Sequence, residues 1–292
     1  MGRANTVMLS ESADPREQES ALVAQARAGD RDAFESLIEP LRRPLFAYIL
    51  RMVAHRQDAE DLLQDALIRA LRGVREFHGQ SRFKTWLFSI ATNACLDYLR
   101  RRKRWRVEAQ LDAEKSASAD DEVVGRIRAV MADPAFLFEI REHIAYCFSC
   151  VARTLEPEEQ AALLLREVFG FQAAEAAQIM DVSRPVFGHR LGSAREKMTE
   201  HFEGLCALIG KQGACWQCRK LREFAPEERR GPDLVQIQVG PGLTVTPTSL
   251  LDARLAIVRE ADLESGRTQQ LHDWFFEATS RLAEEGQPFR TK

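Results

Sequence analysis

The sequence predicts a mainly α-helical protein, with two helical domains joined by a flexible linker and followed by a small α+β C-terminal extension. Apolar residues recur at helical spacing through most of 20–106 and 136–206. Residues 107–135 lose that periodicity, and short β-type runs begin only after residue 206. The length of 292 residues is also enough for about two domains.

The composition is that of an ordinary soluble protein, with 45% hydrophobic and 29% charged residues. A formal net charge of -3 gives no global sign of nucleic-acid binding, so any such function must rest on local basic patches. Residues 1–20 lack the apolar core of a signal peptide, and no window approaches the roughly 18 apolar residues of a membrane span. We therefore expect a cytoplasmic protein with no membrane partner.

The first domain is expected over residues 20–106, after a polar, flexible leader at 1–19. A break at Gly29 separates a short helix from a longer one. Residues 58–77, DAEDLLQDALIRALRGVREF, then form a strongly amphipathic helix with an acidic start. Periodicity alone is equally consistent with a core helix whose carboxylates are solvated.

The stretch 83–106, FKTWLFSIATNACLDYLRRRKRWR, begins as an apolar helix pattern and ends as a block of positive charge. On the side of this helix opposite the apolar residues lie short polar groups that can approach a base or phosphate: Thr85, Ser89, Thr92 and Asn93. Six cations stand within the seven residues 100–106, interrupted only by Trp105. Such a concentration of positive charge favours binding of a polyanion. Alone, such a run is also typical of a solvated helix end whose cations complement the helix dipole.

The second domain, residues 136–206, contains a short Ala-rich helix at 172–180, a turn at 181–183 and a longer helix from Arg184. This order is the helix-turn-helix pattern, whose second helix enters the DNA major groove. The linker at 107–135 is acidic and weakly periodic. The extension, 207–292, is expected to hold a β-hairpin within 234–246 and two helices at 250–261 and 268–285.

Two C-x-x-C pairs, Cys147 with Cys150 and Cys215 with Cys218, are candidate metal ligands. More than sixty residues separate the pairs, far more than in a compact zinc ribbon, so they must meet in space to share a metal. A structural zinc or redox-responsive site, plain buried thiols and a catalytic dithiol all remain open. A catalytic dithiol would normally lie in a βαβ context, which the sequence lacks. We expect no required cofactor.

Four segments together resemble an extracytoplasmic-function (ECF) sigma factor of the bacterial sigma-70 family. They are GDRDAFESLIEPL, DAEDLLQDALIRALRGVREF, FKTWLFSIATNACLDYLRRRKR and the later LEPEEQAALLLREVFGFQAAEAAQIMDVSRPVFGHRLGSAREKM. The resemblance covers about two thirds of the chain, with both sigma regions in the expected order. It implies a transcription initiation factor, without catalysis, that binds core RNA polymerase and directs it to promoters, melting and reading the −10 element.

The resemblance also implies roles for individual residues. Asp61, Gln64 and Asp65 would lie on the helix that docks on the clamp helices of the largest RNA polymerase subunits. The loop that begins at Phe77 and contains Ser81 would form, with Asn93, the pocket that captures a flipped base of the −10 element. The residues that would bind the backbone phosphates are Lys84, Arg100, Arg101 and Arg104. Those that would contact the −35 element are Arg184, His189, Arg190 and Arg195.

The helix-turn-helix departs from the family pattern, which usually has Thr and two basic residues where this chain has Val186, Gly188 and Ser193. We therefore expect the −10 domain to contribute most of the promoter affinity. The resemblance leaves room for an anti-sigma partner, or for self-inhibition or assistance by the extension. The alternative function is a stand-alone helix-turn-helix regulator with a metal- or redox-responsive cysteine site.

Overall fold

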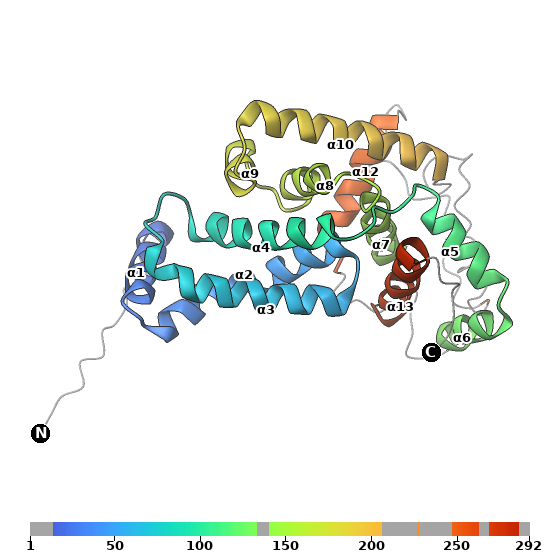
Figure 1. Cartoon of the computed structure of the whole chain (residues 1–292), viewed down its shortest axis with the longest axis horizontal. Coiled ribbons are helices and arrows are strands. Elements are labelled where there is room, and N and C mark those ends of the chain that lie inside the picture. Colours follow the sequence, from blue (N-terminus) through green and yellow to red (C-terminus); the bar gives the residue numbers. More distant parts are fainter. Residues whose placement is uncertain (1–13, 133–139, 206–226, 228–246, 263–268, 286–292) are drawn as a thin grey trace, which may run out of the picture.

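The computed structural model describes residues 14–132, 140–205, 227, 247–262 and 269–285, and every regular element of these parts is helical (Figure 1). The first domain contains α1 (Pro15–Arg27), α2 (Arg31–Val53), α3 (Arg56–Gly73), the 3-10 turn η1 (Val74–Glu76) and α4 (Phe83–Arg100). The second contains α7 (Ile140–Ala152), α8 (Pro157–Leu163), the π-helical turn η2 (Leu164–Val168), α9 (Ala173–Ile179) and α10 (Arg184–Leu205).

Capping residues determine where the first two helices of the first domain begin. Asp30 accepts hydrogen bonds from the first amides of α2, at 2.9 and 3.1 Å, and Gly29 takes a φ of +100°, so the break expected there is confirmed. Helix α1 begins earlier than the expected end of the leader at residue 19. Its start is fixed by Asp14, whose carboxylate accepts the Arg16 amide at 3.0 Å, and by Pro15 in the first turn.

The segment expected to be a flexible linker is largely helical, which corrects that expectation. It forms α5 (Ala109–Ser118) and α6 (Asp121–Ala132), and α5 packs against the C-terminal extension. The buried stripe of α5 consists of alanines, Ala109, Ala113 and Ala117, at i, i+4 spacing. Alanine adds little hydrophobic contrast to a sequence, and this explains why the periodicity looked weak.

The extension contributes α12 (Pro247–Glu260) and α13 (Gln269–Ser280), the latter followed by the π-helical turn η5 (Arg281–Glu285). Helix α12 packs on α7 and α10, whereas α13 packs on α3, α5 and α7. The two expected helices are therefore confirmed, but the described part of the extension gives no support for an α+β class. The expected hairpin within 234–246 lies outside the described residues.

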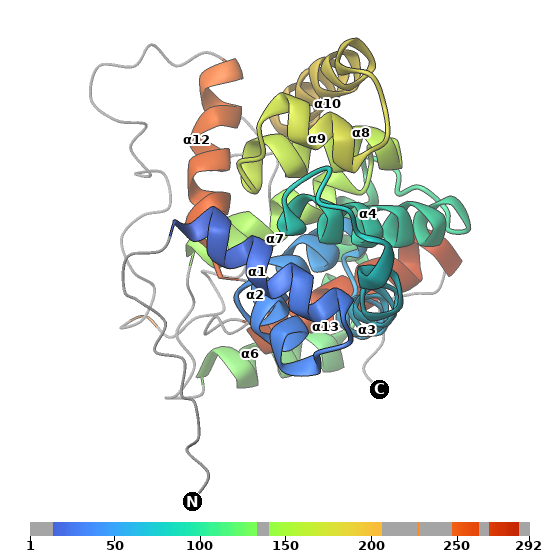
Figure 2. The same ribbon diagram turned by 90° about the vertical axis from the view of Figure 1, so that its left-hand side faces the viewer.

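Helix α4 lies at the centre of the molecule, between the α2–α3 layer and the layer of α8, α9 and α10 (Figures 1 and 2). Because it is covered on both sides, two of the short polar residues expected to face DNA are buried. Thr85 is almost inaccessible, and Thr92 is hydrogen-bonded to the Tyr48 hydroxyl at 3.0 Å. The exposed side of α4 is therefore narrower than its sequence pattern predicts.

Buried polar side chains join the two domains and the extension at helix ends. Gln160 of α8 donates from Nε2 to the backbone oxygens of Arg51 and Met52, both at 3.0 Å, in the last turn of α2. The Arg51 guanidinium in turn donates to the backbone oxygens of Val258 and Ala261, at 3.3 and 3.0 Å, where α12 ends. Carbonyls at a helix C-terminus lack intrahelical partners, so these contacts satisfy groups that would otherwise be buried without hydrogen bonds.

Two contacting histidines sit in the buried interface between α7 and α13. His143 Nδ1 and His272 Nε2 are 3.1 Å apart, and both rings stack on Tyr146. Burial lowers the pKa of His143 to about 4 and holds the pKa of His272 well below its usual value, with the neighbouring His143 adding to the effect on His272. The pair is therefore neutral at pH 7.

This pair predicts a loss of stability in mild acid. The unfolded chain binds protons at an ordinary histidine pKa near 6.5, whereas folded His143 does so only near 4, so stability falls as pH drops between these values. We expect His143 alone to cost about 2 kcal/mol at pH 5, measured by urea unfolding at pH 7.5 and 5. His272→Gln should reduce this dependence, whereas His78→Gln, at an exposed position, should not; equal dependence in both variants contradicts the account.

Candidate nucleic-acid interface

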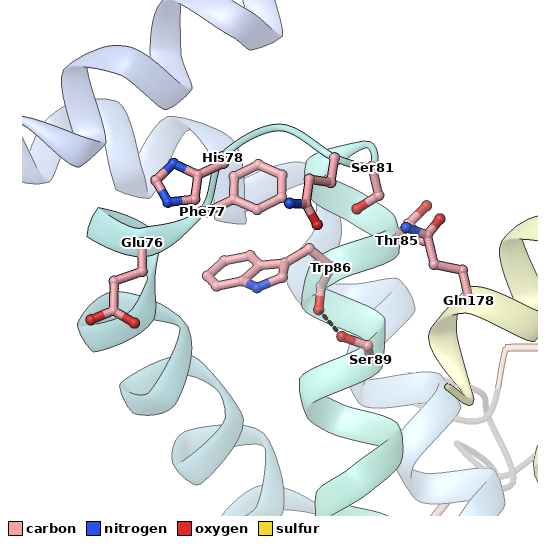
Figure 3. Close-up of a pocket in the computed structure, with 9 residues that line it drawn as sticks. Glu76, Phe77, His78, Ser81, Thr85, Trp86, Ser89 and Gln178 are labelled. Atoms are coloured by element: carbon pink, nitrogen blue, oxygen red, sulfur yellow. Dashed lines mark hydrogen bonds between the residues drawn. The ribbon is translucent and has the colours of Figure 1, made fainter. Parts of the chain in front are cut away.

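A cavity of about 270 Å³ lies where the loop after η1 meets the first turns of α4 (Figure 3). Aromatic and short polar side chains line it together: Glu76, Phe77, His78, Gln80, Ser81, Thr85, Trp86, Ser89 and Gln178. Aromatic faces can stack on a ring, and the polar groups can form hydrogen bonds with its edge. The cavity therefore has the chemistry of a site for a planar, hydrogen-bonding ring.

The aromatic wall of the cavity is rigidly built. The Phe77 and Trp86 rings stack with centroids 4.9 Å apart and planes 28° apart, and Phe83 meets Phe77 edge-on at 6.0 Å. The end of α3 leaves room for the indole through Gly73, where an added Cβ would lie only 3.3 Å from the Trp86 ring. Ser89 donates to the backbone oxygen of Trp86 at 2.7 Å, one turn further along α4.

The structure brings Phe77 and Ser81 to this cavity, but not Asn93. Asn93 is exposed one helical turn beyond Ser89 and does not line the cavity, so its contact with a base stays a prediction. Trp86 lines the cavity although it was not among the residues expected there, since it falls within the apolar helix pattern of 83–106. The signal that could have found it is an aromatic residue in the first turn of a helix that follows a polar loop.

The basic segment after α4 is largely engaged within the chain. Helix α4 ends at Arg100, and Trp105 is buried although the cations on both sides of it are exposed. Arg100 pairs with Asp97 at 3.2 Å and with Glu158 of α8 at 2.9 Å, and Arg104 pairs with Glu156 at the start of α8.

Among the remaining predicted phosphate contacts, Arg101 is exposed and makes no ion pair with a described residue. The Lys84 ammonium lies 4.6 Å from the centre of the Phe171 ring, between η2 and α9. Two of the four cations expected to hold DNA phosphates, Arg100 and Arg104, thus pair with carboxylates of the second domain, and Lys84 lies against one of its rings.

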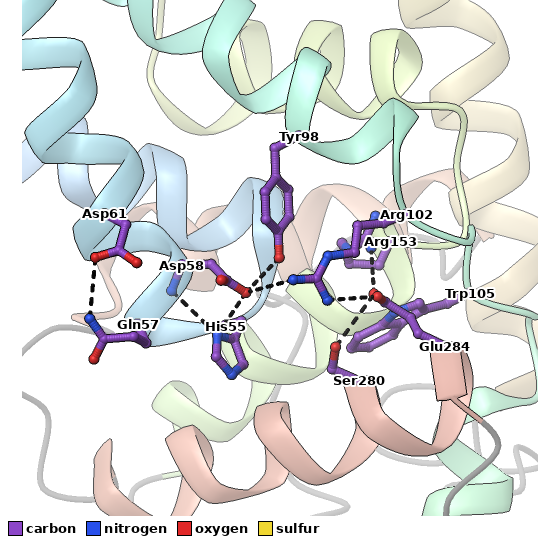
Figure 4. A network of polar contacts seen from close by, with 10 residues as sticks. All are labelled: His55, Gln57, Asp58, Asp61, Tyr98, Arg102, Trp105, Arg153, Ser280 and Glu284. Atoms are coloured by element: carbon purple, nitrogen blue, oxygen red, sulfur yellow. Dashed lines mark hydrogen bonds and ion pairs between the residues drawn. The ribbon is translucent and has the colours of Figure 1, made fainter.

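Two carboxylates organise the polar network at the end of α4 (Figure 4). Asp58 accepts the Tyr98 hydroxyl at 2.5 Å, and it contacts His55 at 2.8 Å and Arg102 at 3.5 Å. Glu284 of η5 approaches the other side of Arg102. Because burial dominates and the Asp58 carboxylate adds to it, the pKa of the Tyr98 phenol is raised far above its usual range, so it remains a donor.

The helix-turn-helix forms as its sequence predicts. Asp181 takes a left-handed φ of +49°, and the Val182 amide donates to the Ala177 backbone oxygen at 3.0 Å, which closes α9. Phe187 anchors α10 in the core. The turn thus directs the first residues of α10 outward.

The predicted −35 residues divide into two groups. Arg184 and His189 are exposed near the start of α10, and Arg190 is half-buried. Arg195 instead pairs with Glu167 of η2 at 2.8 Å and with Asp252 of α12 at 2.7 Å. Arg195 therefore connects α10 to the extension in this arrangement, and its role in DNA contact stays a prediction.

The outer face of α3 is open to solvent. Asp61, Gln64 and Asp65 are exposed there, together with Ile68 and Leu71, which are 46% and 45% exposed. Across the described residues only one other large apolar side chain is exposed, Val186 at 43%. Apolar groups at such positions are candidates for a partner surface.

The cysteine pairs show no metal site in the part of the chain described. Cys147 and Cys150 lie buried on α7, and Cys215 and Cys218 lie outside the described residues. No group of three potential ligands comes together among the described histidines, cysteines and carboxylates. A zinc site shared between the pairs stays a prediction.

Known families match both domains. Residues 37–105 match Sigma-70 region 2, and residues 146–198 match Sigma-70, region 4. The chain is 30% identical over 193 residues to the ECF RNA polymerase sigma-E factor of Escherichia coli K12, which covers 64% of this chain and 95% of the relative. These matches place two sigma-70 regions in one chain, and the chain belongs to the ECF RNA polymerase sigma factors.

Other relatives extend this comparison. The chain is 34% identical over 186 residues to the ECF RNA polymerase sigma factor SigG of Mycobacterium tuberculosis, covering 60% of this chain and 49% of the relative, so it spans about half of that protein. A solved complex of CnrH with the cytosolic domain of CnrY is 21% identical, with a TM-score of 0.44, and covers 64% of this chain and 97% of that one. Within the described residues, no helix has the length and apolar character needed to cross a membrane.

Proposed function

We propose that this chain is a transcription initiation factor that binds core RNA polymerase and directs it to promoters. The observation that carries the proposal is the arrangement of one domain. A cavity suited to a planar base lies at one end of α4, a basic segment follows the other end, and the neighbouring α3 presents an exposed face.

The cavity explains how a −10 element would be read. Extrusion of a base from the duplex costs a few kcal/mol of stacking and pairing, which a site must offset. Trp86 supplies the stacking face, and Ser81, with Gln80, supplies groups for the base edge. Lys84, Arg100, Arg101 and Arg104 would hold the backbone phosphates, which position the strand without specifying its sequence.

The outer face of α3 is the proposed docking surface for the polymerase clamp. It combines two exposed apolar side chains, Ile68 and Leu71, with the exposed polar groups of Asp61, Gln64 and Asp65. An apolar centre within a polar surround is typical of interfaces that form between stable partners. The face is open while most of the basic segment is engaged, so docking needs no rearrangement of the chain.

Val186 is the proposed sequence reader at the −35 element. It is exposed beside Arg184 at the N-terminal end of α10, the part of a recognition helix that contacts base edges, and an apolar side chain suits the thymine methyl group. Replacing −35 thymines by uracil should weaken binding about fourfold, from one lost methyl contact, and Val186→Ser should abolish that difference. Uracil placed between the elements is the control, and an unchanged methyl effect in Val186→Ser contradicts the assignment.

A stand-alone helix-turn-helix regulator is not favoured, because such a protein has no need of a sigma region 2. The proposed role requires no reaction catalysed by the chain, and it places the protein in the cytoplasm with its DNA. An anti-sigma partner remains a further prediction. The direct test is to purify the full chain with core polymerase. Stable, stoichiometric association supports the proposal, and the absence of any association contradicts it.

A further inference from the structure

The C-terminal extension contacts both sigma domains at once. Helix α12 packs on α7, α10 and η2 of the second domain, and its end is held by Arg51 of α2. Helix α13 packs on α7 and also contacts α3. There Asp273 of α13 pairs with Arg56, the first residue of α3, with 2.6 Å between Arg56 Nε and a carboxylate oxygen of Asp273. The α12–α13 segment thus bridges two bodies that have to separate if α4 is to be uncovered.

Glu284 is the central polar contact of this bridge (Figure 4). Its Oε1 accepts from the Trp105 indole at 3.1 Å and from Arg153 at 3.2 Å, and its Oε2 accepts from Arg102 at 3.0 Å. Arg102 and Trp105 follow α4 in the first domain, whereas Arg153 follows α7 in the second. We call these four residues the Glu284 latch.

The latch is built from buried charge. The side chains of Arg153 and Glu284 are 3% and 9% exposed, and the Arg153 guanidinium lies 5.4 Å from the centre of the Trp105 ring. A buried guanidinium without its carboxylate is strongly unfavourable, so the charge of Glu284 holds the three segments together. Its neutral amide analogue keeps the shape but removes that attraction.

The arrangement held by the latch places two carboxylates and helix α9 against the DNA-facing elements. Glu156, which caps α8, pairs with Arg104, and Glu158 of α8 pairs with Arg100, while Gln178 of α9 lines the cavity beside Trp86. A phosphate backbone would have to displace these carboxylates. Ile68 and Leu71 also stay exposed on the α3 face, and the ion pair between α13 and α3 involves Arg56, the first residue of α3.

We propose that the α12–α13 segment is a built-in inhibitor of promoter binding, fastened by the Glu284 latch, which leaves the polymerase-docking face of α3 open. The inference rests on the proposed function. In the latched chain the carboxylates of α8 stand where DNA phosphates would bind. Release of Glu284 lets α8 and α9 move away from α4, so the chain reaches a promoter after it has docked on polymerase.

The test uses the full chain, core polymerase and a library of genomic fragments from the encoding organism as template. Glu284→Gln should raise the yield of specific transcripts roughly fivefold or more, because the closed arrangement loses its differential stability, while core affinity changes by less than about twofold. Small-angle scattering of the free chain should show a larger radius of gyration. Glu277→Gln is the matched control, since Glu277 pairs with Arg281 one turn away on its own helical segment.

The outcomes separate this inference from the proposed function. Unchanged or lower transcript yield from a folded Glu284→Gln chain that binds core normally overturns the latch. Failure of the wild-type chain to bind core polymerase overturns the proposed function instead. If Glu284→Gln does not retain wild-type helicity by circular dichroism, Asp273→Asn tests the same segment through its contact with Arg56, with the same increase expected and the same unchanged yield counting against the proposal.

Discussion

Trp86→Ala is expected to reduce promoter opening by about tenfold to a hundredfold while leaving polymerase binding unchanged. The indole is the stacking face of the cavity and rests on Phe77 at 4.9 Å. Stacking of a base on an aromatic side chain contributes about 1–3 kcal/mol, which corresponds to this range of rates. Permanganate reactivity of unpaired thymines in the non-template strand measures the opening directly.

Two variants control for the packing that Trp86 also provides. Trp86→Phe keeps an aromatic face and should retain most of the opening. Asn93→Ala tests whether the polar residue one turn beyond the cavity rim contributes, and a clear loss of opening there extends the base site along α4. Normal opening by a folded Trp86→Ala chain would contradict the assignment of this cavity to the flipped base.

Ile68→Asp is expected to weaken core polymerase binding by about thirtyfold with almost no change in stability. Ile68 is 46% exposed, so its replacement leaves the core intact, and exposed substitutions usually change the free energy of unfolding by less than about 0.5 kcal/mol. The few residues that dominate an interface each contribute about 2 kcal/mol or more of binding, and Ile68 is expected to be one of them. Fluorescence anisotropy of the labelled chain with core polymerase measures the affinity.

The chain offers a matched control for this substitution. Val186 is a similarly exposed apolar side chain, at 43%, but it lies on the recognition helix far along the sequence from α3. Val186→Asp should leave core affinity unchanged, whereas Leu71→Asp should weaken it as Ile68→Asp does. Equal core affinity for all three variants and the wild type would exclude α3 as the docking surface.

The local elements were largely predictable because their signals are local. Gly29 with Asp30 marks the start of α2, and the turn at Asp181 precedes the recognition helix, as the sequence indicates. Each of these features depends on residues within a few positions of one another. The same holds for α3, whose apolar and polar positions alternate with helical spacing.

The remaining features depend on contacts between distant segments, which no local pattern contains. Thr92 is buried against Tyr48 of α2, 44 residues earlier, and Trp105 is buried where Glu284, 179 residues further on, accepts its indole proton. No local pattern shows that carboxylates of the second domain and the extension pair with Arg100, Arg102 and Arg104 of the basic segment. The helices at 109–132 were missed because alanine forms the buried stripe of α5.

The central claim is that this chain directs RNA polymerase to promoters. The most direct measurement is to map transcript 5′ ends from genomic fragments incubated with core polymerase, with and without the purified chain. The account predicts new start sites that appear only with the chain, share a common −10 sequence and disappear with Ile68→Asp. Identical start sites with and without a folded chain would contradict it.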